Sequence, residues 1–494
     1  MGARKAIVIG AGFSGLASAA VMAQKGYHVT LLEKNSAPGG RARSFTKDGF
    51  KFDMGPSWYW MPEIMEQFFN RFSRTTADLF ELRRLDPSYQ VIFDKENTAI
   101  IPADYNDLKA FFESREAGSA DKLDQFLAEA QQKYETGMGK FVNKPCLSIM
   151  EFVTLEVMKS AFKLDLLSSF SKHVRKYFKS EELLQLLEFP ILFLGALPKD
   201  IPALYSMMNY ADMKLGTWYP MGGFGKLVDA MVTIAQDTGV TIELNTNVET
   251  FEIDKGKIRA VHTSRGTFEA DVVISSADYH FTEQKLLERK DRTYSPKYWE
   301  KRTMAPSCLI YYLGVNKKIS RLQHHNLFFE ENFAAHARAI YTKPDWPTKP
   351  LYYVCCPSKT DPSVAPEGME NLFILIPVAP GLQDTTEIRQ RYFKEIMQRL
   401  EEYCGENIEQ HVISYTDYAA SNFIADYNAF KGNAYGLANT WSQTAVLKPS
   451  IKSSKVKNLY YTGQLTVPGP GVPPAIISGQ LVADCIIKKQ KKVV

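Results

Sequence analysis

The glycine spacing near the start of the chain restricts the fold more than any other feature of the sequence. Residues 5–9 (KAIVI) form a short β-branched run of the kind found in buried parallel strands. Three glycines follow in G-x-G-x-x-G spacing, at Gly10, Gly12 and Gly15, and an Ala-rich segment leads from them to Gly26. This order of strand, glycine turn and helix predicts the first unit of a Rossmann-type α/β fold.

Each glycine has its own physical task in such a unit. We expect Gly10 to permit the tight turn, Gly12 to let the backbone approach a pyrophosphate, and Gly15 to let the helix lie close to the strand. The start of the helix, at Phe13 and Ser14, offers free N–H groups and a positive dipole end to the phosphates. The motif therefore predicts a dinucleotide-binding site.

An acidic residue at the end of the next strand supports this prediction. Residues 27–32 (YHVTLL) form a second apolar run, and Glu33 and Lys34 follow it directly. A carboxylate in this position accepts the hydroxyls of the adenosine ribose. Glutamate rather than arginine at position 33 argues against NADP as the ligand.

A second loop after Glu33 indicates a flavin rather than a nicotinamide cofactor. Residues 38–43 (PGGRAR) contain Gly39 and Gly40, which admit close backbone approach, and Arg41, which supplies a cation for the pyrophosphate. A Rossmann domain that binds NAD alone has no use for this loop, although an ordinary solvated loop is the alternative. A third short segment extends the candidate site by three residues, Gly55, Pro56 and Ser57.

Two distant segments carry further glycine signals. Residues 221–225 (MGGFG) precede an amphipathic helix expected over 226–238, and a strand and the candidate residue Val248 follow. Near the C-terminus, residues 458–463 form a strand that ends at Gly463.

A Pro/Gly loop, PGPGVPPA (468–475), connects that last strand to a helix expected from Ala475. The loop contains Gly471, Val472 and Pro473. The helix start can face the N1–C2=O edge of a flavin, and a plain loop before an amphipathic helix is the alternative.

Together these segments resemble the flavin-dependent amine oxidase superfamily and, within it, the bacterial-type carotenoid desaturases of the phytoene dehydrogenase family. The resemblance extends along nearly the whole chain and is carried by IVIGAGFSGLASA, LLEKNSAPGGRARSF, FDMGPSWYWMP, YPMGGFGKLVDAM, ADVVISSADYHFTE, CPSKTDPSVAPEGMENLFILIPV and NLYYTGQLTVPGPGVPPAIISG. Gln464 and Pro474 depart from the usual residues, an acid and a glycine, which affects the flavin contact in detail.

The resemblance implies FAD as cofactor, a lipophilic carotenoid as substrate, and oxygen or quinone as electron acceptor. It also implies an α/β fold with a discontinuous Rossmann-like FAD-binding domain, an interleaved α+β substrate domain and a helical, membrane-docking subdomain. The expected divisions are an FAD-binding domain of 1–75, 220–285 and 450–494, a substrate domain of 76–140 and 286–449, and a helical subdomain of 141–219.

Composition excludes several other classes of protein. Of 494 residues, 45% are hydrophobic and 23% are charged, which is ordinary for a globular chain. A net charge of +4, with both signs interspersed, is too small to indicate a nucleic-acid partner. Six cysteines without C-x-x-C spacing predict no disulfide framework, and we expect a reducing, cytoplasmic compartment.

The sequence predicts no metal site. His324 and His325 are adjacent, so their side chains are expected to diverge, and no acid or cysteine cluster accompanies them along the chain. Cys355 and Cys356 lie in an apolar strand, where neighbouring side chains face opposite sides.

Two apolar segments are candidates for contact with lipid or substrate. Residues 141–178 mix apolar and cationic side chains, and residues 189–198 (FPILFLGALP) carry no charge. An apolar face bordered by cations is typical of a helix at a lipid interface, which predicts peripheral membrane association, and ordinary packing is the alternative. Three aromatic residues, Trp58, Tyr59 and Trp60, are expected either to line an apolar tunnel or to pack in the core.

The mechanism implied by the resemblance is hydride transfer from the polyene to flavin N5, followed by loss of a proton from the resulting allylic cation. Because that proton is lost easily, no catalytic acid or base is assigned. A flavin-dependent isomerase, a desaturase of a later hydroxylated or cyclised carotenoid, and a prenyl-binding escort protein remain alternatives. The oligomeric state has no signal in the sequence.

Overall fold

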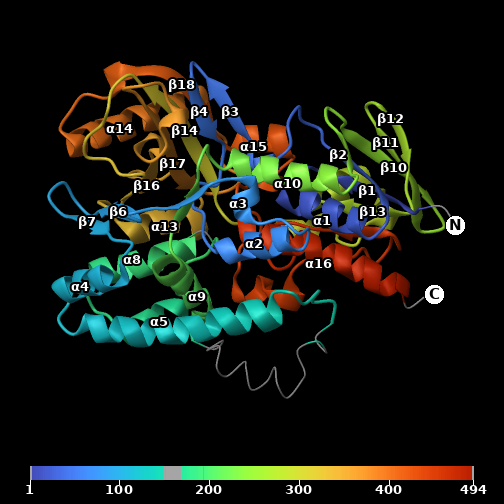
Figure 1. The fold of residues 1–494 in the computed structure, drawn as a ribbon, viewed down its shortest axis with the longest axis horizontal. Coiled ribbons are helices and arrows are strands. Elements are labelled where there is room, and N and C mark those ends of the chain that lie inside the picture. The colour runs from blue at the N-terminus through green and yellow to red at the C-terminus, as the bar shows by residue number, and fades with distance from the viewer. Residues whose placement is uncertain (1–2, 149–150, 152–167, 193, 492–494) are drawn as a thin grey trace.

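The computed structural model describes residues 3–148, 151, 168–192 and 194–491. Two lobes lie side by side, each built around a β-sheet, and a layer of helices lies along one side of the second sheet (Figure 1). Both termini lie at the end of the first lobe, next to each other (Figure 1).

The first lobe contains a five-stranded parallel sheet. Its strands, in spatial order, are β19 (Leu459–Tyr461), β13 (Val272–Ser275), β1 (Lys5–Ile9), β2 (His28–Leu32) and β9 (Thr241–Glu243). In the centre, Val8 pairs with Leu31 on one side and with Ile274 on the other. Strands that are far apart in the sequence therefore meet in one sheet, as the glycine-marked segments predict. The proposed domain boundaries themselves stay a prediction.

Three helices cover one face of this sheet, where they pack with Ala6, Val8 and Leu31. They are α1 (Phe13–Gln24), α10 (Gly225–Asp237) and α16 (Val472–Lys491). Helix α1 contacts both of the others, and its residues from Phe13 to Met22 are all buried. The final helix begins three residues before the predicted Ala475, because Pro473 and Pro474 occupy its first turn.

A small antiparallel sheet lies at the end of this lobe (Figure 1) and covers the other face of the parallel sheet, since Phe251 and Val261 share a buried cluster with Ile7 and its neighbours. The antiparallel sheet consists of β10 (Val248–Asp254), β11 (Lys257–Thr263) and β12 (Gly266–Glu269). The strands of the parallel sheet are therefore apolar on both faces.

The second lobe contains a seven-stranded mixed sheet. Its strands, in spatial order, are β18 (Val412–Tyr418), β14 (Ser307–Val315), β17 (Glu370–Val378), β16 (Tyr352–Cys355), β15 (His325–Phe328), β6 (Tyr89–Ile92) and β7 (Thr98–Ile101). Side chains alternate between its two faces, as the pleat requires. Leu309 and Tyr311 pack beside α14 (Thr386–Cys404), whereas Ile310 and Tyr312 join the central core.

Shorter elements connect the lobes. Two small antiparallel pairs are β3 (Ser44–Lys47) with β4 (Phe50–Asp53), and β5 (Leu82–Arg84) with β8 (Trp218–Pro220). The remaining short helices are α2 (Pro62–Asn70), α3 (Thr76–Leu79), α11 (Tyr279–Phe281), α12 (Pro296–Glu300), α13 (Phe333–Tyr341) and α15 (Ala420–Tyr427).

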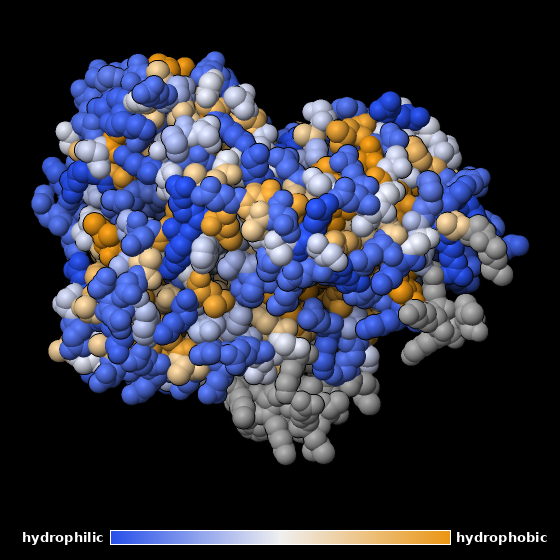
Figure 2. Space-filling view, viewed as in Figure 1, coloured by the Kyte–Doolittle hydropathy of each residue, from blue (hydrophilic) through white to orange (hydrophobic). Residues whose placement is uncertain are grey.

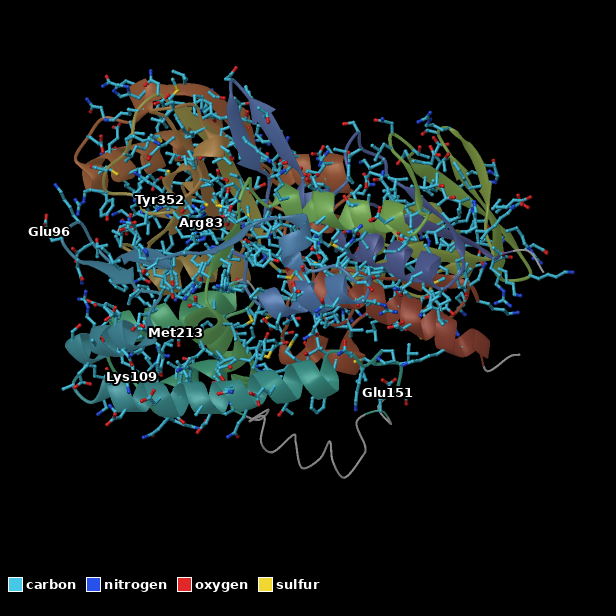
Figure 3. All side chains as sticks on the ribbon, in the orientation of Figure 1. Arg83, Glu96, Lys109, Glu151, Met213 and Tyr352 are labelled. Atoms are coloured by element: carbon cyan, nitrogen blue, oxygen red, sulfur yellow. The ribbon has the colours of Figure 1, made fainter. Side chains whose placement is uncertain are left out.

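The helical layer contains α4 (Tyr105–Arg115), α5 (Ser119–Thr136), α7 (Phe170–Val174), α8 (Glu181–Leu192) and α9 (Met207–Tyr210). Figure 3 labels Lys109 on α4 and Met213 just after α9, and Tyr352 marks the sheet above them.

The apolar segment 189–198 is buried in this layer. Four of its side chains are at most 7% exposed: Phe189, Ile191, Leu194 and Ala196. The ring of Phe189 packs against that of Trp58, with ring centres 5.8 Å apart. The prediction that this segment forms an exposed lipid-facing surface is therefore wrong for its described residues, because the protein core covers them. The cationic segment 141–178 lies partly outside the described residues.

The described surface has no broad apolar area on the face shown in Figure 2. Hydrophobic residues lie there in small groups among hydrophilic ones. No helix in the described part of the chain combines the length and the apolar character that crossing a membrane requires.

Candidate functional site

A cavity of about 700 Å³ connects the first lobe to the second sheet and the helical layer. At one end its wall contains the carboxyl ends of β1 and β2, and at the other it contains aromatic and aliphatic side chains. The carboxyl edge of a parallel sheet is where such folds bind ligands.

The cavity brings together most of the residues that the sequence predicts for cofactor binding. They are Gly10, Gly12, Phe13, Ser14, Glu33, Lys34, Gly39, Gly40, Arg41, Gly55, Pro56, Ser57, Val248, Gly463, Gly471, Val472 and Pro473. Gly15 lies behind this wall. Its role is in packing, because a Cβ at Gly15 would overlap the carbonyl oxygen of Gly10.

The glycine loop has a different constraint at each position. Gly10 has a φ of +95°, which disfavours any residue with a side chain. Gly12 has an ordinary φ of −76°, and a Cβ built there would meet no protein atom within 4 Å. The protein itself therefore tolerates a side chain at Gly12, and the space beside it is open to a ligand.

Glu33 ties the second strand to the glycine loop. Its buried carboxylate accepts hydrogen bonds from the backbone N–H of Ala11 at 2.8 Å and from that of Asn35 at 2.9 Å. Its backbone oxygen accepts from the N–H of Thr246, which carries the start of β10 and Val248 to the same part of the wall. Next to it, Lys34 donates to the carbonyl oxygen of Ala425 at 2.6 Å.

Arg41 presents a buried guanidinium group to the cavity. Its Nη2 donates to the carbonyl oxygen of Asn433 at 3.2 Å, and the group lies 5.1 Å from the centre of the Tyr427 ring. Its Nε has no hydrogen-bond partner among the described residues. Burial lowers the pKa of Arg41, and Asp278 partly offsets that effect. A buried cation with an unused donor fits an anionic group such as a pyrophosphate.

The C-terminal loop adds the fourth wall segment. Gly463 and Gly471 have φ values of +106° and +116°, so both turns require glycine. The hydroxyl of Ser478 accepts a hydrogen bond from the backbone N–H of Gly463 at 3.0 Å, which holds this loop against α16. Gly479 lets α16 cross α1 closely, because a Cβ there would overlap the carbonyl oxygen of Ser14.

Sequence reasoning missed part of this wall. The cavity is also lined by Ser276, Ala277 and Asp278, which directly follow β13. The sequence ADVVISSAD could have indicated them, because it reads as a strand followed by a turn. Residues of α15 and its end line the same region, and no local pattern indicated them: Phe423, Asp426, Tyr427 and Asn428.

The aromatic trio divides between the two sides of the chain. Trp58 and Trp60 line the cavity, but Tyr59 does not. Tyr59 forms a β-bridge with Trp218, so neighbouring side chains alternate, and its ring packs against Phe224. Of the two alternatives for this trio, core packing therefore holds for Tyr59, whereas Trp58 and Trp60 line the cavity.

The far end of the cavity is aromatic. Trp58 and Trp60 lie with Phe189, Phe329 and Tyr353 in this wall. The carboxylates of the described wall lie elsewhere, beside the glycine and arginine loops: Glu33, Asp278 and Asp426. This arrangement can hold a long apolar molecule against a cofactor at the glycine end.

Comparison with known proteins identifies the family. Residues 13–487 match the family described as flavin containing amine oxidoreductase. The chain belongs to this family. It is therefore an FAD-dependent oxidoreductase, and the glycine loop, the open space at Gly12 and the unused donor of Arg41 fit FAD.

Relatives of this family member cover nearly its whole length. It is 40% identical to a carotenoid 3,4-desaturase of Haloarcula japonica over 97% of both chains. It is 30% identical to a zeta-carotene-forming phytoene desaturase of Myxococcus xanthus, over 97% of this chain and 93% of that one. A 4,4'-diapophytoene desaturase of Staphylococcus aureus is also 30% identical, over 98% and 99%.

Solved structures share the fold at low identity. Putrescine oxidase bound to putrescine matches with a TM-score of 0.63 and 15% identity, over 98% of this chain and 99% of that one. A fatty acid isomerase of P. acnes that produces CLA matches with a TM-score of 0.60 and 15% identity, over 98% of each. At this identity the likeness concerns the fold alone.

Proposed function

We propose that this protein is an FAD-dependent carotenoid desaturase, which introduces C=C double bonds into a lipophilic polyene. The observation that carries the proposal is the 40% identity to a carotenoid 3,4-desaturase over 97% of both chains. Two further relatives, at 30% identity, are also carotenoid desaturases. The aromatic end of the cavity supports the same substrate class, because a polyene has no polar group to satisfy along its length.

The glycine end of the cavity would hold FAD. The N–H groups at the start of α1 and the buried guanidinium of Arg41 suit the pyrophosphate, and Glu33 suits the ribose hydroxyls. The start of α16, at Val472, suits the flavin ring because its positive dipole end favours negative charge there.

The chain's own residues position the polyene. Desaturation removes two hydrogens from adjacent saturated carbons, and FAD supplies the hydride acceptor when it is bound. Trp58, Trp60 and Phe189 form a rigid wall that aligns the chain and keeps water away. The remaining proton leaves a carbon beside an allylic cation, which is strongly acidic. We therefore assign no catalytic acid or base.

The sequence identity to each relative indicates which bond of the carotenoid this protein desaturates. Desaturation at the 3,4 bond, near one end of the polyene, is favoured over the central steps because the 3,4-desaturase is the more similar relative, at 40% against 30%. Desaturation of phytoene in a C40 series is the other candidate.

A carotenoid dissolves in lipid, so we also propose peripheral contact with a membrane and reoxidation by oxygen or a membrane quinone. The buried segment 189–198 does not supply the docking surface with its described residues.

Anaerobic turnover tests the proposal. The FAD-loaded protein is mixed in liposomes with a panel of carotenoids that are saturated either at the 3,4 bond or centrally. The visible absorbance of the flavin and the product mass are recorded. Bleaching with loss of two hydrogens per flavin supports a desaturase, and the carotenoid that bleaches fastest identifies the bond. Conversion without a change of mass would make the protein an isomerase. Purification without flavin would favour the escort protein.

A further inference from the structure

Two motifs that the proposed function does not use meet in the second sheet. β15 and β16 pair antiparallel, and His325 lies opposite Cys355. One ring nitrogen of His324, one of His325 and the Sγ of Cys355 lie within 4.8 Å of one another. All three residues are at most 4% exposed. Tyr352, labelled in Figure 3, marks the start of β16, the strand that carries this cysteine.

Strand pairing creates this cluster, which sequence spacing does not reveal. His324 precedes β15, so it is free of the alternation that would send its side chain away from that of His325. Their rings lie 4.5 Å apart, centre to centre. The cysteine comes from a segment about thirty residues further on.

The two imidazoles are oriented alike. Nδ1 of His324 hydrogen-bonds the hydroxyl of Thr360 at 2.8 Å, and Nδ1 of His325 hydrogen-bonds the hydroxyl of Tyr353 at 2.6 Å. Tyr353 gives its own proton to Ser57, so its oxygen accepts from His325 Nδ1–H. Nε2 of each histidine has no hydrogen-bond partner in the described part of the chain.

Each of these Nε2 atoms is a buried polar atom without a partner, which is costly, and one bound ion would satisfy both. Histidines that bind a metal through one nitrogen typically give the other ring N–H to an oxygen; His325 does so here, and the hydroxyl of Thr360 can accept the same bond from His324.

We propose that His324, His325 and Cys355 bind one Zn²⁺ ion through the two Nε2 atoms and Sγ. Two imidazoles and a thiolate suit zinc, which takes three protein ligands with a water as the fourth. A cavity of about 20 Å³ beside Cys355, lined also by Ser57 and Asp53, has room for one water. Binding replaces the thiol proton: Cys355–SH and Zn²⁺ form Cys355–S–Zn⁺, and one H⁺ leaves.

Zinc in this position would stiffen the wall of the main cavity. The ring of His325 stacks on Trp58, with centres 4.2 Å apart and planes 10° apart, and Trp58 lines the cavity. The ion would therefore act through Trp58 on the alignment of the substrate and take no part in the redox step. The proposal does not depend on which molecule the cavity binds.

The metal content of the purified full-length protein tests the site. The protein is incubated with ZnSO₄, passed through a desalting column and assayed by elemental analysis and zinc X-ray absorption. We expect about one zinc per chain, with two nitrogen ligands near 2.0–2.1 Å and one sulfur near 2.3 Å. Retention of less than about a tenth of an equivalent, or a spectrum without sulfur, would overturn the proposal and indicate a water between the histidines.

A matched pair of cysteine variants separates this site from adventitious binding. Cys355→Ser should weaken zinc binding at least tenfold, whereas Cys356→Ser should retain it, because Cys356 faces the core on the other side of the sheet. Equal zinc binding by both variants would refute the assignment. If Cys355→Ser does not fold, the absorption spectrum of the wild-type protein with Co²⁺ provides the test instead. A thiolate-to-cobalt charge-transfer band is expected, and its absence would count against the site.

Discussion

Replacing Gly12 with valine should remove FAD binding while leaving the fold intact. A Cβ at Gly12 meets no protein atom within 4 Å, and its φ of −76° suits any residue. Valine is a poor residue at a helix N-cap, so the free energy of unfolding should fall by at most about 1 kcal/mol. The isopropyl group would occupy the space of the pyrophosphate, and we expect FAD affinity to fall at least about 100-fold, or about 3 kcal/mol.

Gly15→Ala is the matched comparison, with the opposite expected pattern. Its Cβ would overlap the carbonyl oxygen of Gly10 and lie 3.2 Å from the Cβ of Ser276. These neighbours are largely backbone, so α1 must move away from the sheet. Overpacking of this kind costs about 1–3 kcal/mol. The alanine itself lies outside the cavity, so the loss of FAD should follow the loss of stability.

Two measurements on the same preparations decide the matter. Urea denaturation of each apoprotein gives the free energy of unfolding, and quenching of flavin fluorescence gives the FAD dissociation constant. Gly12→Val protein that binds FAD like the wild type would refute the assignment of the glycine loop to the pyrophosphate. A Gly12→Val variant that loses as much stability as Gly15→Ala would refute the claim that the space at Gly12 is open.

Three further variants test other parts of the structure. Glu33→Ala should weaken FAD binding by about 1.5–3 kcal/mol, the value of a hydrogen bond to a charged group, as measured by the same fluorescence titration; an unchanged dissociation constant would exclude Glu33 from the ribose site. Burial lowers the pKa of Lys448 from 10.5 to about 7, so the folded state binds fewer protons than the unfolded chain between these values, and stability rises with pH across that window. Lys448→Met should therefore stabilise the protein below pH 7, by up to about 5 kcal/mol, and flatten the pH dependence of urea denaturation; a variant with the wild-type slope contradicts this. Trp60→Ala should lower kcat/KM for the carotenoid by about tenfold, since an apolar wall residue is lost, while Tyr59→Phe should leave it unchanged in the same liposome assay.

Local patterns in the sequence predicted the first lobe well. The strand at 5–9, the glycine turn and the helix behind it depend on contacts within a few residues, and each glycine has a conformational or steric reason that the structure bears out at Gly10 and Gly15. Glu33 could be placed because it follows its strand directly. Their roles toward FAD stay predictions.

Tertiary structure alone decided the features that depend on distant partners. It buried the uncharged segment 189–198 under neighbouring helices and strands, although the same residues read as a lipid-facing surface in isolation. It brought Asn433 and Tyr427 to Arg41 from nearly four hundred residues away.

The pairing of β15 with β16 had the same kind of effect, since it set Cys355 beside two histidines that the sequence separates from it. The periodicity of a strand shows that neighbouring side chains alternate, but it does not show which face meets the core or which strand lies alongside. Those choices depend on hydrogen-bond register and packing between segments that are remote in the chain, and only the assembled fold determines them.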